Sequence, residues 1–551
     1  MTSSTAAPPG APRRVLKREI GAIGMLWASV GSIIGSGWLF GAQNGLTAAG
    51  PAAVIAWVIG GVAVLVLALI HAELGGMYPV SGGSARFPHY AFGGAAGASF
   101  GWYAWLQTAT VAPIEVSAMI NYAKHYSFAS GWLTADKTLT ASGLVVAILL
   151  MAVISSINFL GVRALALTNS TATWWKVAVP LVAIFAIAMA GGGLHTGNFT
   201  AADGFAPGGL QGVLGAVSTS GIIFSYLGFE QADQLAGEST NPKRDVPLAI
   251  IGSVVIGVVV YVALQVVFLL ALPASSIGST WAQTTGDVVG AFTGPWAQLA
   301  SLVGLGWLAA VLYADAIISP GGTGLIYTAA TSRVSYGLAR NGYVPTAFER
   351  LNANGVPWVG VIVSFVIGCV CFLPFPSWQS LVGLITSASV LMYAGAPLAL
   401  AVFRKRLPEV ERPYRLPGAA VLAPLGFVIS DLIILWSGWD TDWKLAVAIV
   451  IGYVILFVSR AGGFTSHRPP LHWRSAQWLP VWLVGMLLIT FASTYGGQGW
   501  LDLSVSLVVT AVFSLAIHYW AVAVSLPAEE IRAMIDQVAA EEDALPSLPS
   551  H

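Results

Sequence analysis

A few charged side chains lie inside long apolar stretches of the sequence, where they could bind protons, ions or a polar substrate. Six lie well within such a stretch: Glu115, Lys176, Glu230, Asp233, Asp315 and Asp431. Charges at membrane depth are rare and usually functional, although each could instead bond a neighbouring helix for structural reasons. We favour function for Lys176, Glu230 and Asp315, which lie nearest to mid-stretch. We favour the structural interpretation for Asp431 and for Glu73 at the end of another stretch, and Glu115 stays open.

Glycine and serine interrupt one apolar stretch at "GSIIGSGWLFGA", residues 31–42. A second interruption, around Gly228, lies in "GIIFSYLGFEQADQLAGE", residues 221–238. Five helix positions separate the two, as expected for an inverted repeat of five plus five helices whose paired broken helices hold a substrate at mid-membrane. The alternative is that the glycines only allow close helix packing, for which Gly31 and Gly35 have the right spacing. Packing alone explains the matched pair less well.

The composition identifies a polytopic membrane protein. Of 551 residues, 56% are hydrophobic and 9% are charged, compared with about 25% charged residues in soluble proteins. The formal net charge is zero, so no global field points to nucleic acid as a partner. Cys369 and Cys371 are too few and too close for a disulfide framework, and a metal site would need further ligands. We interpret both as small apolar side chains.

About fourteen apolar runs are long enough, at roughly 20 residues each, to span a membrane. They cover residues 21–48, 51–76, 93–123, 141–159, 168–190, 211–236, 247–272, 297–331, 356–374, 379–402, 417–436, 443–459, 477–494 and 501–524. With a cytoplasmic N-terminus, the loops obey the positive-inside rule. Every Lys and Arg then lies in the cytoplasm, except Lys124, Lys137 and Lys444 outside and Lys176 within a span. Both termini are therefore predicted to lie in the cytoplasm, on the inner side of a cell membrane.

The same pattern divides the chain into four parts. They are a cytoplasmic tail at 1–20, a ten-helix core at 21–405, four additional helices at 406–525 and a second cytoplasmic tail at 526–551. The sequence does not determine the oligomeric state, or a role for the additional helices beyond packing or subunit contact.

Other functional classes are less well supported. No G-x-x-x-x-G-K-[ST] phosphate loop is present to use ATP. A channel would need a continuous polar lining, whereas the charges here are isolated. An enzyme would need a catalytic constellation at one depth, but the histidines within spans, His71 and His518, are far apart and no H-E-x-x-H or serine-triad pattern occurs. We predict neither an enzyme nor a bound cofactor.

Four motifs, in order, resemble those of the amino acid–polyamine–organocation permeases. They are "GSIIGSGWLFGA" in the first span, "MYPVSGGSARF" after the second, "FSYLGFEQADQLAGESTNPKRDVPLAI" from the sixth span into the seventh, and "TSRVSYGLARNGYVPTAFERLNANGVP" after the eighth. Together they cover about residues 17–405. The number of spans resembles that of a branch of bacterial aspartate/glutamate–proton symporters. The resemblance implies an all-α, five-plus-five inverted-repeat fold with the first and sixth helices unwound at the substrate.

The resemblance also implies a binding site for an amino acid. The amides of Gly35, Ser36 and Gly37 would bind the carboxylate of the substrate, because exposed N–H groups at the start of a half-helix attract an anion. Three carbonyls would accept its ammonium group, those of Ile33, Phe224 and Leu227. Phe224 also stands where relatives often place an aromatic gate, although some of them have Trp there.

Proton coupling is the second implication of the resemblance. Some proton-coupled relatives carry a lysine, matched here by Lys176, near the place where sodium lies in sodium-coupled ones. An ammonium group there would repel sodium, and its burial would allow proton transfer. Glu230 matches a carboxylate proposed to respond to protons in some relatives. Alternatively, Lys176 is a fixed ion-pair partner of Asp315 or Glu230.

The sequence therefore predicts a secondary active transporter for an amino acid or related amine, driven by protons. An obligate exchanger of amino acids or amines is the main alternative. The substrate is not determined, because carboxylates near the site favour a cationic substrate whereas the resembling branch implies an acidic one.

Overall fold

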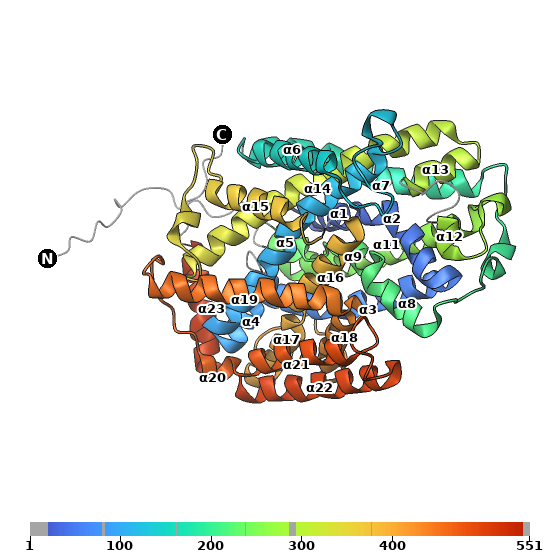
Figure 1. The fold of residues 1–551 in the computed structure, drawn as a ribbon. Coiled ribbons are helices and arrows are strands. Elements are labelled where there is room, and N and C mark those ends of the chain that lie inside the picture. The colour runs from blue at the N-terminus through green and yellow to red at the C-terminus, as the bar shows by residue number, and fades with distance from the viewer. Residues whose placement is uncertain are drawn as a thin grey trace.

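The computed structural model describes residues 20–79, 83–160, 162–236, 239–285, 294–375 and 377–543. Within these ranges the chain is helical and contains no β-strand, only three isolated β-bridges (Figure 1). The predicted N-terminal tail before Ile20 and residues 544–551 of the predicted C-terminal tail lie outside the described residues. The expectation of an all-α protein is confirmed.

Every predicted apolar run coincides with one or more helices. These helices are α1 (Ala22–Ile33), α2 (Gly37–Ala49), α3 (Ala53–Met77), α5 (Gly94–Ala123), α6 (Ala141–Asn158), α7 (Val162–Ala188), α8 (Gly209–Thr219), α9 (Ile222–Tyr226), α10 (Gln231–Gln234), α11 (Pro242–Ala271), α13 (Pro295–Leu302), α14 (Gly306–Arg340), α15 (Trp358–Cys371), α16 (Trp378–Tyr393), α17 (Gly395–Arg406), α18 (Ala419–Ser437), α19 (Trp439–Ala461), α21 (Trp478–Ala492) and α22 (Leu503–Val524). Between or beyond them lie α4 (Gly83–Phe92), α12 (Trp281–Thr285), α20 (Trp473–Ala476) and α23 (Ala528–Asp543).

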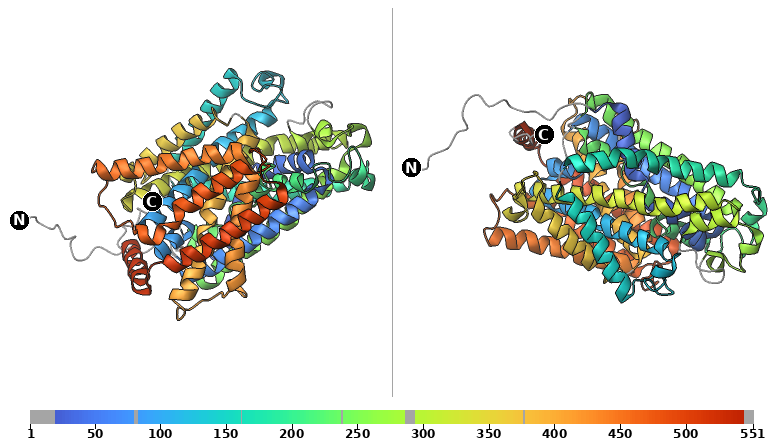
Figure 2. Two further views of the ribbon diagram at one scale, coloured as in Figure 1. Left: turned by 60° about the horizontal axis from the view of Figure 1, so that its bottom comes forward. Right: turned by 90° about the horizontal axis from the view of Figure 1, so that it is seen from above.

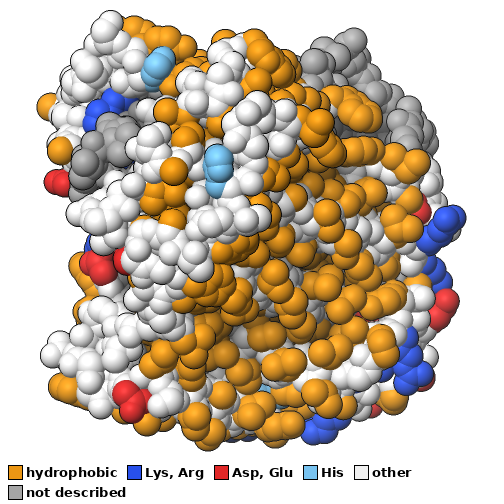
Figure 3. Space-filling model, turned by 90° about the vertical axis from the view of Figure 1, so that its right-hand side faces the viewer, with side chains coloured by type: hydrophobic (Ala, Val, Ile, Leu, Met, Phe, Trp, Pro, Cys, Tyr) orange, Lys and Arg blue, Asp and Glu red, His pale blue; other side chains and the backbone are white. Residues whose placement is uncertain are grey.

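The protein is a multi-pass membrane protein. In the described ranges, nine helical stretches are long and apolar enough to cross a membrane, with α2 and α3, α16 and α17, and α20 and α21 each counted together. Three shorter apolar helices cover Ala22–Ile33, Thr173–Ala188 and Trp358–Cys371. Figure 3 shows a broad hydrophobic surface with charged side chains gathered at its margins, as a bilayer requires. The number of fourteen crossings and the five-plus-five repeat stay predictions.

The loops that the sequence assigns to one side of the membrane contact one another. On the side rich in Lys and Arg, four backbone N–H groups donate to backbone carbonyls of other loops. The pairs are Thr240 N–H to Ile20 O (2.9 Å), Leu526 N–H to Ala91 O (3.1 Å), Ala95 N–H to Leu471 O (2.7 Å) and Thr346 N–H to Phe464 O (2.9 Å). On the other side they donate from Ala52 to Phe205 (2.9 Å), His195 to Leu270 (2.8 Å) and Trp439 to Tyr495 (2.9 Å). Two separate groups of loops agree with the predicted alternation of sides.

The helices with the broken segments lie at the centre of the bundle. Helix α1 packs against α7, α10 and α11, while α3 packs along α11 and α5 along α14. Helices α18 and α19, with α21 and α22, pack together and against α16, so that they form one flank of the molecule (orange and red in Figures 1 and 2). The additional helices are therefore part of the packed bundle.

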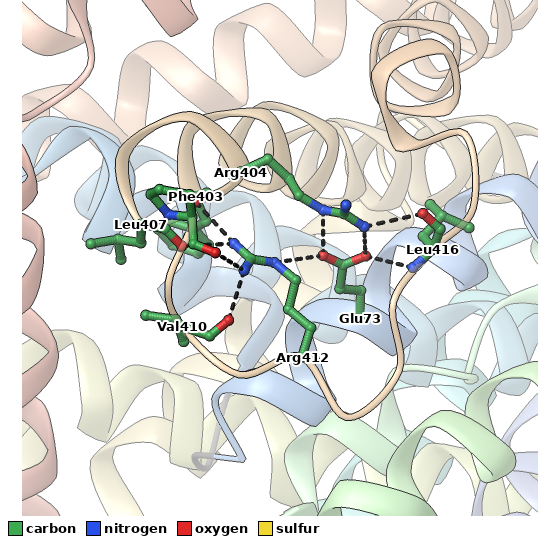
Figure 4. A network of polar contacts seen from close by, with 8 residues as sticks. Glu73, Phe403, Arg404, Leu407, Val410, Arg412 and Leu416 are labelled. Carbon is green, nitrogen blue, oxygen red and sulfur yellow. Dashed lines mark hydrogen bonds and ion pairs between the residues drawn. The ribbon is translucent and has the colours of Figure 1, made fainter.

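Glu73, at the end of α3, is bonded in a polar network that joins α3 to α17 and to the segment linking α17 with α18 (Figure 4). Its carboxylate accepts from Arg404 Nε (2.7 Å) and Nη2 (2.6 Å) and from the Leu416 N–H (2.7 Å), and it pairs with Arg412 Nε at 3.2 Å. The Arg412 guanidinium also donates to the carbonyls of Phe403, Leu407, Pro408 and Val410. These bonds between neighbouring elements support the structural interpretation favoured for Glu73 from its position.

Replacing Glu73 with glutamine is expected to lower the free energy of unfolding by about 3–5 kcal/mol. Glu73 is fully buried and the Arg412 side chain is 6% exposed, so the change leaves buried guanidinium charge without a counter-ion. Thermal unfolding of the detergent-solubilised protein measures the effect. The matched control is Glu411→Gln, which removes an exposed ion pair with Lys243 and should change stability by no more than about 1 kcal/mol. Equal melting temperatures for the two variants would contradict the assignment.

Candidate functional site

The first helix is broken where the sequence predicts. Helix α1 ends at Ile33, Ile34 is extended (φ −88°, ψ 90°), and α2 begins at Gly37. The backbone therefore leaves and re-enters helical geometry within residues 34–36, in the Gly-Ser-rich stretch. This break exposes N–H groups at the start of α2 that a continuous helix would have used internally.

The sixth helix is broken twice. After α9, Leu227 is extended (φ −71°, ψ 148°), and Gly228 has φ +117°, a backbone conformation that favours glycine. This is the predicted break. A second one, not predicted, separates α8 from α9 at Gly221, where φ is +90° and a Cβ atom would lie 2.7 Å from the Trp378 ring. The last two residues of the quoted motif, at 237–238, lie outside the described ranges.

The two predicted breaks touch each other. A Cβ atom on Gly228 would lie 2.8 Å from the Ile33 nitrogen and 2.8 Å from the Ser32 carbonyl carbon. A Cβ atom on Gly37 would lie 3.0 Å from the Ser225 Cα and would collide with its hydroxyl. These glycines therefore allow two broken backbones to approach closely. The contact between the breaks is made at Gly37 and Gly228, whereas Gly31 and Gly35, the pair with packing spacing, lie against Thr173 and against Glu115 and Thr323.

Replacing Gly228 with alanine is expected to disturb both breaks together. The Cβ atom has no room against the backbone of α1, and the positive φ opposes an L side chain, which together cost on the order of 1–3 kcal/mol or more. Substrate-dependent stabilisation of the purified protein should fall in proportion. The control is Gly337→Ala on α14, where a Cβ atom meets nothing within 4 Å. If the substrate stabilises Gly228→Ala as much as it stabilises the wild type, the sixth-helix break is not part of the substrate site.

A protein carboxylate lies at the start of α2. The Ser36 N–H, one of the three amides assigned by resemblance to the substrate carboxylate, donates to Glu115 Oε2 (3.2 Å) and Oε1 (3.4 Å). Glu115, on α5, is fully buried. A Cβ atom on Gly35 would lie 2.9 Å from Glu115 Oε1, so the absence of a side chain there makes room for the carboxylate. The Ser36 amide at the break is therefore bonded to a carboxyl group that the protein itself supplies.

Lys176, on α7, lies beside the same break. Its ammonium group donates to Thr323 Oγ1 on α14 (2.6 Å) and to the Gly31 carbonyl on α1 (3.4 Å). The Gly35 Cβ position is also 3.4 Å from Thr323 Oγ1, so the Glu115 carboxylate and the hydroxyl that Lys176 bonds both lie beside this glycine. Lys176 is 1% exposed. One buried cation and one buried carboxylate therefore converge on the unwound part of the first helix.

Two of the three carbonyls assigned by resemblance to the substrate ammonium already have protein partners in this conformation. The Ile33 carbonyl accepts from the Tyr261 hydroxyl (2.8 Å) and from the Gly35 N–H (3.2 Å). The Phe224 carbonyl accepts from the Leu227 N–H (3.2 Å). A carbonyl oxygen has two lone pairs, so an ammonium group would have to replace a donor at Ile33.

Glu230 joins the sixth-helix break to two other helices. Its carboxylate accepts from the Gly228 N–H (2.9 Å), from Gln107 Nε2 on α5 (3.1 Å) and from the Tyr393 hydroxyl on α16 (2.6 Å). The side chain is fully buried. Glu230 therefore stabilises the unwound backbone of the sixth helix, much as Glu115 does that of the first.

Asp315 lies on α14, about two turns before Thr323. Its Oδ1 accepts from Trp175 Nε1 (2.8 Å) and from the Ser319 hydroxyl (2.5 Å), and its Oδ2 has no partner among the described residues. Trp175 directly precedes Lys176 in the chain. The Thr323 hydroxyl donates to the Ser319 backbone carbonyl (3.1 Å). A chain of hydrogen bonds therefore links the surroundings of Asp315 to Thr323, the partner of Lys176.

Aromatic rings cover the site on one side. The Trp378 ring lies 4.9 Å from that of Phe40 and 5.9 Å from that of Phe224, in an edge-on arrangement with the latter. Trp378 Nε1 also donates to the Ser36 hydroxyl (3.1 Å). Phe224, the predicted gate, is 7% exposed and Ser36 is fully buried. A substrate can reach the breaks only if these rings or the adjoining helices move.

Sequence reasoning missed several partners in this site. Glu115 was recognised as a charge within a span, yet the sequence does not show that it faces Ser36. Thr323, Tyr393 and Trp378 carry no signal beyond being polar or aromatic within apolar runs. Among the described residues, no group of three or more His, Cys, Asp or Glu side chains is arranged to hold a metal ion.

A multi-pass helical bundle with two touching helix breaks and buried charges is an arrangement that many membrane transporters use. A family model described as amino acid permease matches residues 20–484. The glutamate/serine transporter AimA of Bacillus subtilis (strain 168) is 34% identical over 518 residues, covering 92% of this chain and 94% of that protein. The aspartate-proton symporter of the same organism is 33% identical over 506 residues, covering 91% and 96%. The chain therefore belongs to the amino acid permease family, within the amino acid–polyamine–organocation superfamily.

A more distant relative is the branched-chain amino acid permease BcaP of Bacillus subtilis, 27% identical over 462 residues, which cover 80% of this chain and 93% of that protein. These names describe transporters and not enzymes.

Proposed function

We propose that the protein is a secondary active transporter that carries an amino acid across the cell membrane together with protons, by alternating access, with both termini in the cytoplasm. The observation that carries this proposal is the pair of buried charges at the first-helix break. Glu115 accepts from the Ser36 N–H, and Lys176 donates to Gly31 and Thr323. The aspartate-proton symporter among the relatives supports protons as the coupling ion.

Protonation of Glu115 would couple proton binding to substrate binding. The charged carboxylate occupies the Ser36 N–H that a substrate carboxylate would use, so the two anions compete for one donor. A proton on Glu115 removes the competing charge and weakens its hydrogen bond, because charge-assisted bonds are roughly twice as strong as neutral ones. Substrate and proton would then bind together, as symport requires.

Lys176 would hold the unwound first helix in place while this exchange occurs. Its bonds connect α7, α14 and α1, so a change of charge at Glu115 alters the field on a group that joins three helices. The same ammonium opposes binding of a sodium ion nearby. Glu230 would hold the unwound sixth helix in place at the second break. Asp315 would act on Thr323, the partner of Lys176, through the hydrogen bonds of Ser319.

The substrates to test first are glutamate, aspartate and serine, because they appear in the names of two relatives that are 34% and 33% identical. All three present the same carboxylate to the start of α2. The site must then distinguish their side chains by residues from other helices.

Uptake by the purified protein in liposomes tests the proposal. Radiolabelled substrate should accumulate when the outside is more acidic than the lumen, and a protonophore should abolish accumulation. An inward sodium gradient without a pH gradient should have no effect. Uptake that depends on the sodium gradient, or that is the same with and without either gradient, would overturn proton symport.

Obligate exchange is the alternative mechanism. An exchanger would take up labelled substrate only when the lumen is preloaded with an amino acid or amine, and would ignore the pH gradient. Counterflow measured without any ion gradient, compared with uptake into empty liposomes, separates the two mechanisms.

A further inference from the structure

A groove of about 700 Å³ lies at the basic end of the bundle, away from the helix breaks. One wall is the beginning of α11, and the other is Pro413 and Tyr414 in the segment that links α17 with α18. The Glu73 network described above holds the inner side of the same segment through Arg412 and Leu416 (Figure 4). The groove is therefore formed between two anchored elements.

Two cationic side chains line the groove. Lys243 and Arg244, in the first turn of α11, are both exposed. Lys243 pairs with Glu411 at 2.7 Å, but the side chains are 57% and 74% exposed, and such a pair contributes little and is readily exchanged. The neighbouring Asp245 is buried and accepts from Ser239 (3.0 Å) and from the Asn241 N–H (3.2 Å). Its carboxylate is therefore engaged within the loop.

Apart from Asn241, the rest of the groove is mostly apolar, and its apolar lining continues along α11. Leu248 and Ile251 line the groove, and Leu248 is 43% exposed. Val255 and Val259, exposed at 45% and 65%, continue the same face of the helix, because residues spaced by four, seven and eleven positions from Leu248 lie on one side. A pair of cations thus stands at the end of an exposed apolar stripe.

We propose that this groove binds the headgroup of an anionic phospholipid, with Lys243 and Arg244 on its phosphate and an acyl chain along the stripe from Leu248 to Val259. Basic pockets between membrane helices on the cytoplasmic side suit anionic headgroups in this way. The apolar stripe distinguishes a lipid from a free phosphate, which has nothing to place on it. Such a lipid would bridge α11 and the segment around Tyr414 and thereby stabilise this end of the bundle.

Native mass spectrometry of the detergent-purified, delipidated full-length protein, titrated with phosphatidylglycerol or phosphatidylcholine, tests the proposal. We expect the wild type to bind phosphatidylglycerol more tightly. The double variant Lys243→Gln/Arg244→Gln should lose affinity for it by roughly fivefold for each charge, or about 25-fold in all. The control is Arg350→Gln/Lys405→Gln, which removes two exposed cations that do not line the groove. It should bind phosphatidylglycerol like the wild type.

Two further arms make the result decisive. Arg244→Lys keeps the charge and should keep the affinity, which covers the case in which the double variant fails to fold. Inorganic phosphate at millimolar concentration should not displace the lipid. Equal affinity of the wild type for the two lipids, unchanged affinity in the double variant, or displacement by inorganic phosphate would each overturn the proposal. Because binding is measured directly, these outcomes do not depend on whether the protein transports amino acids.

Discussion

Replacing Lys176 with alanine is expected to abolish proton-driven accumulation of the substrate, so that uptake falls to that of empty liposomes. The ammonium group is buried and bonds both the Gly31 carbonyl and Thr323. A water molecule could take its place only if the site were large enough and offered the water further hydrogen-bond partners. Its loss removes the positive charge nearest to the first-helix break and releases α1 from α7 and α14. Exchange of substrate for substrate can persist, because it requires no net proton movement.

The measurement is uptake under an inward pH gradient, followed by counterflow in the same liposomes. The matched control is Lys444→Ala, which removes a lysine at the beginning of α19 that is paired with Asp440. This change should leave uptake unchanged. Full proton-driven accumulation by Lys176→Ala would remove Lys176 from the coupling mechanism.

Replacing Gly37 with leucine is expected to weaken substrate binding by about 10- to 100-fold. A Cβ atom at this position would lie 3.0 Å from the Cα and 3.1 Å from the Cβ of Ser225, so a leucine side chain must separate the two breaks. Overpacking of this kind costs about 1–3 kcal/mol. The side chain would also occupy the space in front of the amides at the start of α2, where a substrate carboxylate would bind.

Binding is best measured as substrate-dependent thermal stabilisation, because it does not require transport. Gly337→Leu is the control, since the corresponding Cβ position on α14 meets nothing within 4 Å. Wild-type affinity in Gly37→Leu would place the substrate elsewhere.

The sequence predicts the helices and their interruptions well because both depend on local composition. Apolar runs of sufficient length correspond to helices, and Gly35, Gly37 and Gly228 mark the two predicted breaks, whereas the break at Gly221 was not predicted. The eighth run was predicted as one helix from residue 297, but α13 ends at Leu302 and α14 begins at Gly306. Gly304, with φ +82°, turns the chain between them.

The partners across the site could not be predicted, because they depend on how distant helices face one another. Glu115 and Ser36 are 79 positions apart, and Tyr393 and Glu230 are 163 apart. A helix that is apolar on all sides gives no periodic signal of the direction in which one polar residue points. For this reason Glu115 stayed open between function and structure, and the Tyr261 hydroxyl on the Ile33 carbonyl was not foreseen.

The central claim is that a proton enters with each amino acid, and the most direct test is to watch the proton. Liposomes containing the purified protein and a trapped pH indicator, with equal pH on both sides and the membrane potential clamped, receive external substrate. We predict that the lumen acidifies when substrate is added, that a protonophore removes the signal, and that Lys176→Ala shows none. Saturable entry of labelled substrate without any acidification of the lumen would contradict proton symport.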